Sequence, residues 1–154
     1  MPTIALAACG GGGSASGEVP GRQSPYLSLQ LPGPISQHGA VAIGASRVAL
    51  LGGSRNVGVL SSSIHVLDAN SGAWTEVLQM TTGRADMRVL ALSPTLLFVH
   101  GGARSLTGSR AAEWADLTTG LSTPAVVSHL RQHHTVTQLL DGRILVAGGL
   151  STEG

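Results

Sequence analysis

Short apolar runs alternate with polar, glycine-rich segments along most of this chain. Three of the runs, Arg47–Leu51 (RVALL), Leu96–His100 (LLFVH) and Arg143–Ala147 (RILVA), are rich in branched residues, and each is followed directly by two glycines. Such runs predict β-strands. No stretch has the spacing of a long amphipathic helix, so the pattern predicts an all-β chain.

The glycine pairs indicate a tandem repeat, because they recur 49 and 47 residues apart, at positions 52, 101 and 148. Residues without Cβ suit a strand end where the backbone turns sharply or another backbone comes close. We therefore expect structural roles at Gly52, Gly53, Gly101, Gly102, Gly148 and Gly149.

Other residues keep the same register relative to these glycines. Arg84 and Arg131 each lie seventeen residues before a pair, and His38 and His134 each lie fourteen before one. Asp68 and Asp116 follow the pairs at similar distances, and each begins a turn that ends in glycine, DANSG and DLTTG. Each copy thus predicts strand, turn, strand, Gly-Gly, longer loop, strand, tight turn and strand.

This register resembles the kelch repeat, and the third copy, RQHHTVTQLLDGRILVAGG, is especially similar to the bacterial kelch proteins of the galactose oxidase-like branch. The resemblance implies four-stranded antiparallel blades of a β-propeller over 35–154, with repeats at 35–83, 84–130 and 131–154, the last partial. Only the first copy has the Trp of the motif, Trp74, and Met87 replaces the His of the other copies. About two and a half repeats make an incomplete propeller, which we interpret as a fragment whose open edges favour self-association.

Residues 1–9 end in Leu-Ala-Ala-Cys, which resembles a bacterial lipobox, and Cys9 is the only cysteine. The resemblance implies lipidation at Cys9 after a truncated signal segment, although no basic residue precedes the apolar stretch and that stretch is short. A Gly/Ser/Pro-rich linker at 10–34 would separate the repeats from the membrane. We expect a lipid-anchored protein of the bacterial envelope, in the outer membrane of a Gram-negative cell because Gly10 follows the cysteine.

Composition limits the candidate chemistry. A net charge of +1 with scattered arginines and no lysine argues against nucleic-acid binding. We expect no metal site, because His133 and His134 are neighbours on an expected strand and would point to opposite faces. The acidic residues Asp68, Asp116, Asp141 and Glu113 are expected to serve turns or other repeated structural positions.

Two side chains are possible ligand contacts, namely His100, which the other copies lack, and Trp114. We expect Trp74 to be buried between its own blade and a neighbour.

The favoured function is a non-catalytic interaction module for a protein or a glycan, without a cofactor. The alternative is part of a galactose oxidase-like copper enzyme, or of another carbohydrate-active propeller, with its active site outside these residues. The sequence argues against a copper-radical site within these 154 residues, because Tyr26 and Cys9 are the only tyrosine and the only cysteine.

Overall fold

The computed structural model describes residues 30–56, 58–104, 112–127 and 131–151. The chain divides into two units between Pro34 and Ile35, and all the strands belong to the second unit. Cys9 and most of the 10–34 segment lie outside the described residues. No described segment forms a helix, so none could span a membrane as a long apolar helix.

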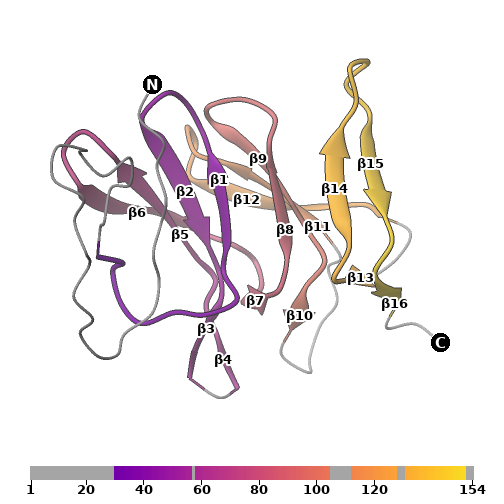
Figure 1. The fold of residues 1–154 in the computed structure, drawn as a ribbon, viewed down its shortest axis with the longest axis horizontal. Coiled ribbons are helices and arrows are strands. Elements are labelled where there is room, and N and C mark those ends of the chain that lie inside the picture. Colours follow the sequence, from indigo (N-terminus) through magenta and orange to yellow (C-terminus); the bar gives the residue numbers. More distant parts are fainter. Residues whose placement is uncertain (1–29, 57, 105–111, 128–130, 152–154) are drawn as a thin grey trace, which may run out of the picture. The chain divides into compact units, whose positions relative to one another are not determined.

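The first repeat forms a four-stranded antiparallel sheet in the order β1-β2-β5-β6 (Figure 1). Its strands are β1 (Gly39–Ala42), β2 (Arg47–Leu51), β5 (Ser63–Asp68) and β6 (Ala73–Gln79). The expected longer loop after the glycines contains a small hairpin of β3 (Ser54–Asn56) and β4 (Val59–Leu60). Its short strands were not predicted, because SRN and VL carry too few residues to show a period.

The second repeat has the same order, β8-β9-β11-β12. Its strands are β8 (Arg88–Ala91), β9 (Leu96–His100), β11 (Ala112–Asp116) and β12 (Leu121–Ala125). A separate pair of short strands, β7 (Arg84–Ala85) and β10 (Ala103–Arg104), lies at one end of this sheet. The prediction of an all-β chain with four-stranded antiparallel sheets is therefore confirmed.

The described residues of the third repeat form two antiparallel pairs of strands. β14 (Thr135–Gln138) pairs with β15 (Ile144–Ala147), and β13 (Arg131–Gln132) pairs with β16 (Leu150–Ser151). β15 begins one residue later than predicted, because Arg143 instead bonds the preceding turn: its amide and its guanidinium both donate to the Asp141 carboxylate.

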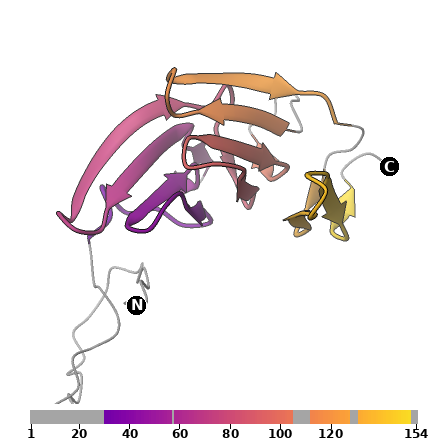
Figure 2. The ribbon, with the colours of Figure 1, turned by 90° about the horizontal axis from the view of Figure 1, so that it is seen from above.

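The core lies between the two four-stranded sheets, which pack face to face (Figure 2). Met87 belongs to this core, so the residue that replaces the recurrent histidine is an apolar packing residue. The first strands of successive repeats are neighbours: β1 lies beside β8, and β8 beside β14 (Figure 1). The core residues are Ile43, Ala49, Leu51, Ile64, Val66, Leu78, Met80, Met87, Leu97, Val99 and Ala115.

Candidate functional site

The Gly-Gly end of each sheet is where successive repeats join. The Gly53 amide donates to the Arg84 carbonyl of the second repeat at 2.8 Å, and the Gly102 amide donates to the Arg131 carbonyl of the third at 3.1 Å. A Cβ on Gly52 would collide with that same Arg84 carbonyl, and one on Gly101 would collide with the Arg131 carbonyl. The first residue of each of these two pairs must therefore be glycine, because the next repeat leaves no room for a Cβ there.

The second residue of a pair must also be glycine, because a backbone carbonyl of the same repeat occupies the space of a Cβ. A Cβ on Gly53 would lie 2.7 Å from the Ser36 carbonyl, and one on Gly102 would collide with the Ala85 carbonyl. Ser36 bridges to Ser54, and Ala85 pairs with Ala103, so the same closure recurs in both repeats. The structure places all six predicted glycines at positive φ.

Three non-glycine residues share an unusual backbone at this end. Gln37, Asp86 and His133 have φ values of 56°, 56° and 53°, and each lies fifteen residues before a glycine pair. We call these three residues the αL row. Positive φ in residues other than glycine costs free energy and is often found at functional positions. At this position the three repeats therefore share one backbone conformation but differ in side chain.

The αL row is polar and open to solvent. Gln37 and His133 are exposed and Asp86 is half-buried. The Gln37 side-chain amide donates to the Asp86 carboxylate at 2.9 Å, and the Asp86 backbone amide donates to the Gln37 carbonyl at 2.9 Å. The row thus presents an amide, a carboxylate and an imidazole on successive repeats. These groups can donate and accept hydrogen bonds.

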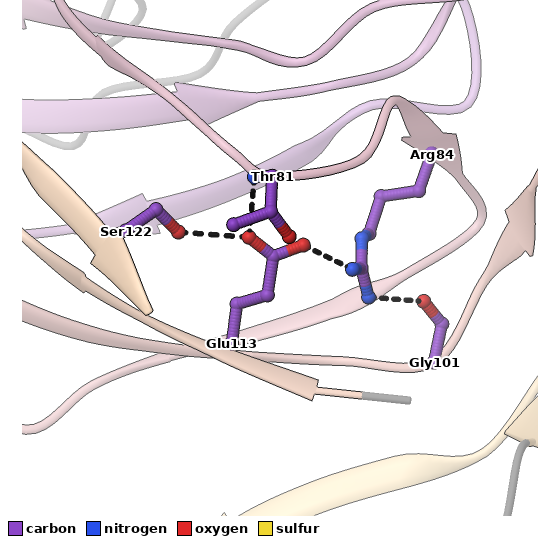
Figure 3. Close-up of polar contacts among 5 residues, drawn as sticks. All are labelled: Thr81, Arg84, Gly101, Glu113 and Ser122. Atoms are coloured by element: carbon purple, nitrogen blue, oxygen red, sulfur yellow. Dashed lines mark hydrogen bonds and ion pairs between the residues drawn. The ribbon is translucent and has the colours of Figure 1, made fainter. Parts of the chain in front are cut away.

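A buried ion pair supports the second repeat beneath this end (Figure 3). Arg84 and Glu113 are completely buried and bond through Nη2 and Oε1, while Arg84 Nη1 donates to the Gly101 carbonyl at 3.2 Å. The other Glu113 oxygen, Oε2, accepts from the Thr81 amide at 2.6 Å and the Ser122 hydroxyl at 2.8 Å. Glu113 was expected at a turn or other repeated position. It lies instead within β11 and holds the segment that enters the repeat.

The recurrent arginines share one of these bonds. Arg131 Nη1 donates to the Gly148 carbonyl at 3.0 Å, as Arg84 Nη1 does to the Gly101 carbonyl. Arg131 is more exposed than Arg84, and among the described residues of the third repeat no acidic side chain forms an ion pair with it as Glu113 does with Arg84. The arginine therefore closes its own repeat by holding the carbonyl of the first glycine.

A buried histidine pair lies between the second and third repeats. His100 Nδ1 and His134 Nε2 are 2.9 Å apart, so one ring donates a hydrogen bond to the other. Burial, and then the nearby charges of His134 and Arg84, lower the pKa of His100 to about 4. Burial and the Arg88 charge also lower the pKa of His134. Both rings are therefore neutral at pH 7, and a ligand could reach His100 only if this interface opened.

The two tryptophans have partly buried side chains. The ring of Trp114 packs on Phe98 with centroids 4.7 Å apart. Trp74 lies on β6, paired with Leu67, and is only partly buried. Neither indole is a fully exposed platform for a sugar ring.

The two recurrent aspartates cap matching turns. Asp68 Oδ1 accepts from the amides of Asn70 and Ser71, and Asp116 Oδ1 accepts from those of Thr118 and Thr119. The bonds from the Thr118 amide, and more weakly from Thr119, lower the pKa of Asp116. These turns lie at the end of the sheets opposite to the αL row, because Asp68 pairs with Arg47 at the start of β2.

His133 and His134 do not share a strand as expected, because both lie between β13 and β14; His133 is exposed and His134 is buried. Within the described ranges, His, Cys, Asp and Glu form no group of three or more that could hold a metal ion.

Sequence reasoning did not find the αL row. Residue type gives no signal there, since Gln, Asp and His have little in common, and only their shared register could have indicated it. Comparison of the sequence with models of known protein families finds no match, and comparison with curated proteins finds none either.

Proposed function

We propose that this chain is a non-catalytic binding module made of kelch-type propeller blades, and that it binds a glycan or a protein through the αL row. One observation carries the proposal: Gln37, Asp86 and His133 occupy equivalent, strained backbone positions with different, solvent-accessible polar side chains. A constant scaffold that presents varied polar groups from one end is typical of recognition surfaces.

The kelch assignment is supported by the recurrent strand order of the first two repeats and by the adjacency of β1, β8 and β14. In a propeller, the first strand of each blade lies nearest the central axis, so residues just before these strands surround one opening of the channel. The αL row precedes β1, β8 and β14 by two residues each. The side chains of the row would then face a ligand together.

Glycine substitutions test this binding surface without disturbing its backbone, because glycine favours the positive φ that these positions require. The variant Gln37→Gly/Asp86→Gly/His133→Gly should fold as the wild type does and lose its binding to an array of bacterial glycans and envelope proteins. Asn70→Ala is a matched control, since it removes an exposed polar side chain at the opposite end of the sheet. Unchanged binding by the triple variant would refute a role for the αL row.

The proposed location is the bacterial envelope, with Cys9 carrying the lipid anchor and 10–34 acting as a tether. Support for this comes from the Leu6–Cys9 motif alone. Expressed with its upstream sequence in bacteria, the protein should incorporate a fatty-acid analogue, and Cys9→Ser should abolish the labelling and the membrane retention. Labelling that persists in Cys9→Ser would contradict the anchor.

A further inference from the structure

The contacts that join the first repeat to the second, and the second to the third, are built alike. We call them the first joint and the second joint. A Cβ on Gly52 would collide with the Met87 side chain of the second repeat, and one on Gly101 would collide with the His134 side chain of the third. Met87 and His134 each lie fourteen residues before a glycine pair. They therefore occupy the same place, one in each joint.

The residue just before each glycine pair extends this difference between the joints. At the first joint it is Leu51, which belongs with Met87 to the apolar core. At the second joint it is His100, whose Nδ1 lies 2.9 Å from Nε2 of His134. All four side chains are buried. The second joint thus contains a hydrogen-bonded pair of titratable rings where the first contains two apolar side chains.

Protonation disfavours the closed form of the second joint. In the neutral pair, one ring donates an N–H to the lone pair of the other, whereas a protonated imidazole has two donors and no lone pair. One proton places a positive charge in a buried position, and a second leaves neither ring able to accept the bond. His134 Nδ1 is buried without a hydrogen-bond partner among the described residues, so a proton there would have no acceptor.

The surroundings of the pair are already positive. The charged or titratable groups that act on it from the elements packed around it are Arg84 of β7, Arg88 of β8, Arg131 of β13 and His133, between β13 and β14. Two acidic residues of the second repeat, Asp86 and Glu113, bond Gln37 and Arg84 rather than either histidine. Burial, and after it the neighbouring charges, lower the pKa of both rings, that of His100 to about 4. A proton on the pair would add to this positive cluster.

We propose that the His100–His134 pair is an acid-sensitive latch, which holds the third repeat on the second at neutral pH and releases it in mild acid while the first joint stays closed. Release would carry His133 away from Asp86 and so divide the αL row. The latch operates whether or not the αL row binds a ligand.

The direction and size of the effect follow from proton binding. In the open joint both rings face water, where histidine takes up a proton near pH 6.5, whereas in the closed joint His100 does so only near pH 4. Acid therefore favours the open joint. From His100 alone, the ratio of open to closed joints should rise roughly 25-fold between pH 7.5 and 5.0. The lowered pKa of His134 acts in the same direction.

Urea unfolding of the whole 154-residue chain at pH 7.5 and 5.0 tests the latch, with each tryptophan as a separate reporter. Trp114 packs on Phe98, which lies beside His100, so in Trp74→Phe the fluorescence follows the second joint. In Trp114→Phe it follows Trp74, on β6 of the first repeat. We expect acid to move the Trp114 transition to lower urea by more than it moves the Trp74 transition.

The variant His100→Leu/His134→Met gives the second joint the side chains of the first. It should lose at least the roughly 25-fold part of the acid effect on the Trp114 transition and leave the pH dependence of the Trp74 transition unchanged. His38, whose pKa burial also lowers, is present in both proteins, so its contribution cancels. If this variant does not fold, His100→Gln/His134→Gln replaces it, because glutamine keeps hydrogen-bonding groups that do not titrate.

Two results would overturn the latch. One is a Trp114 transition that responds to pH as strongly in the substituted protein as in the wild type. The other is a wild-type Trp74 transition that shifts with pH as much as the Trp114 transition, because acid would then act on the whole array rather than on the second joint.

Discussion

Removal of the Glu113 carboxylate should be among the most destabilising single changes in the second repeat. In Glu113→Ala, Arg84 keeps its charge in a completely buried position but loses its ionic partner, and the Thr81 amide and Ser122 hydroxyl lose their acceptor. Breaking a buried ion pair by removing one partner costs about 3 to 5 kcal/mol. We expect a decrease of that size in the free energy of unfolding.

Removal of both charges should cost less than removal of one. In Arg84→Met/Glu113→Leu no charge remains buried, and apolar side chains of similar length fill the space, so part of the lost stability should return. The double variant still loses the bond from Arg84 to the Gly101 carbonyl and the bonds that Glu113 accepts from the Thr81 amide and the Ser122 hydroxyl, which leaves a deficit of about 1 kcal/mol for each bond.

Urea unfolding of the wild type, Glu113→Ala, the single variants Arg84→Met and Glu113→Leu, and the double variant measures these differences. Asp141→Asn is the control for charge removal, because the Asp141–Arg143 pair is exposed, with side chains 50% and 78% accessible, and its loss should leave the midpoint unchanged. The reasoning is refuted if Glu113→Ala unfolds at the wild-type midpoint, or if the double variant loses as much stability, relative to the wild type, as Arg84→Met and Glu113→Leu lose together.

Three further changes test other features. Stability should fall as the pH drops from about 6.5 to 4, because the unfolded chain binds a proton that buried His100 does not; the loss from His100 is at most about 3 kcal/mol and is complete near pH 4, and the pH dependence should be smaller in His100→Gln, where the lowered pKa of His134 still contributes. Gly101→Val should lower the free energy of unfolding by about 1 to 3 kcal/mol and expose the His100–His134 interface to proteolysis, whereas proteolysis at the wild-type rate would contradict the joint at Gly101. Trp74→Ala should cost about 2 kcal/mol, less than the loss of a fully buried tryptophan, and a loss above 4 kcal/mol in thermal unfolding would contradict the partial burial of this side chain.

The features predicted correctly from sequence are those fixed by local pattern. The strands at Arg47–Leu51 and Leu96–His100 agree with the structure to the residue, because branched apolar runs that end in Gly-Gly define both ends of a strand. The aspartate-to-glycine turns follow equally from local chemistry, since the carboxylate bonds amides two and three residues ahead.

The features that could not be predicted depend on partners distant in sequence. Glu113 lies 29 residues from Arg84, and His100 lies 34 residues from His134, so only the packing of the strands brings them together. Glu113 lies between Ala112 and Trp114 in a strand, where one acidic residue can equally face solvent or a buried arginine. The αL row was missed for a different reason, because positive φ is predicted from glycine and none of its members is glycine.

The bonds that cross from one repeat to the next have a consequence for how the protein unfolds. The amide protons of Gly53 and Gly102 are each held by a carbonyl of the following repeat. Each can exchange with solvent deuterons only when that neighbour detaches, so their exchange rates measure the free energy of individual couplings along the array. The stability of a repeat protein can be described as the sum of the stabilities of single repeats and the interaction free energies between neighbours; the exchange of these two protons measures the interaction free energies.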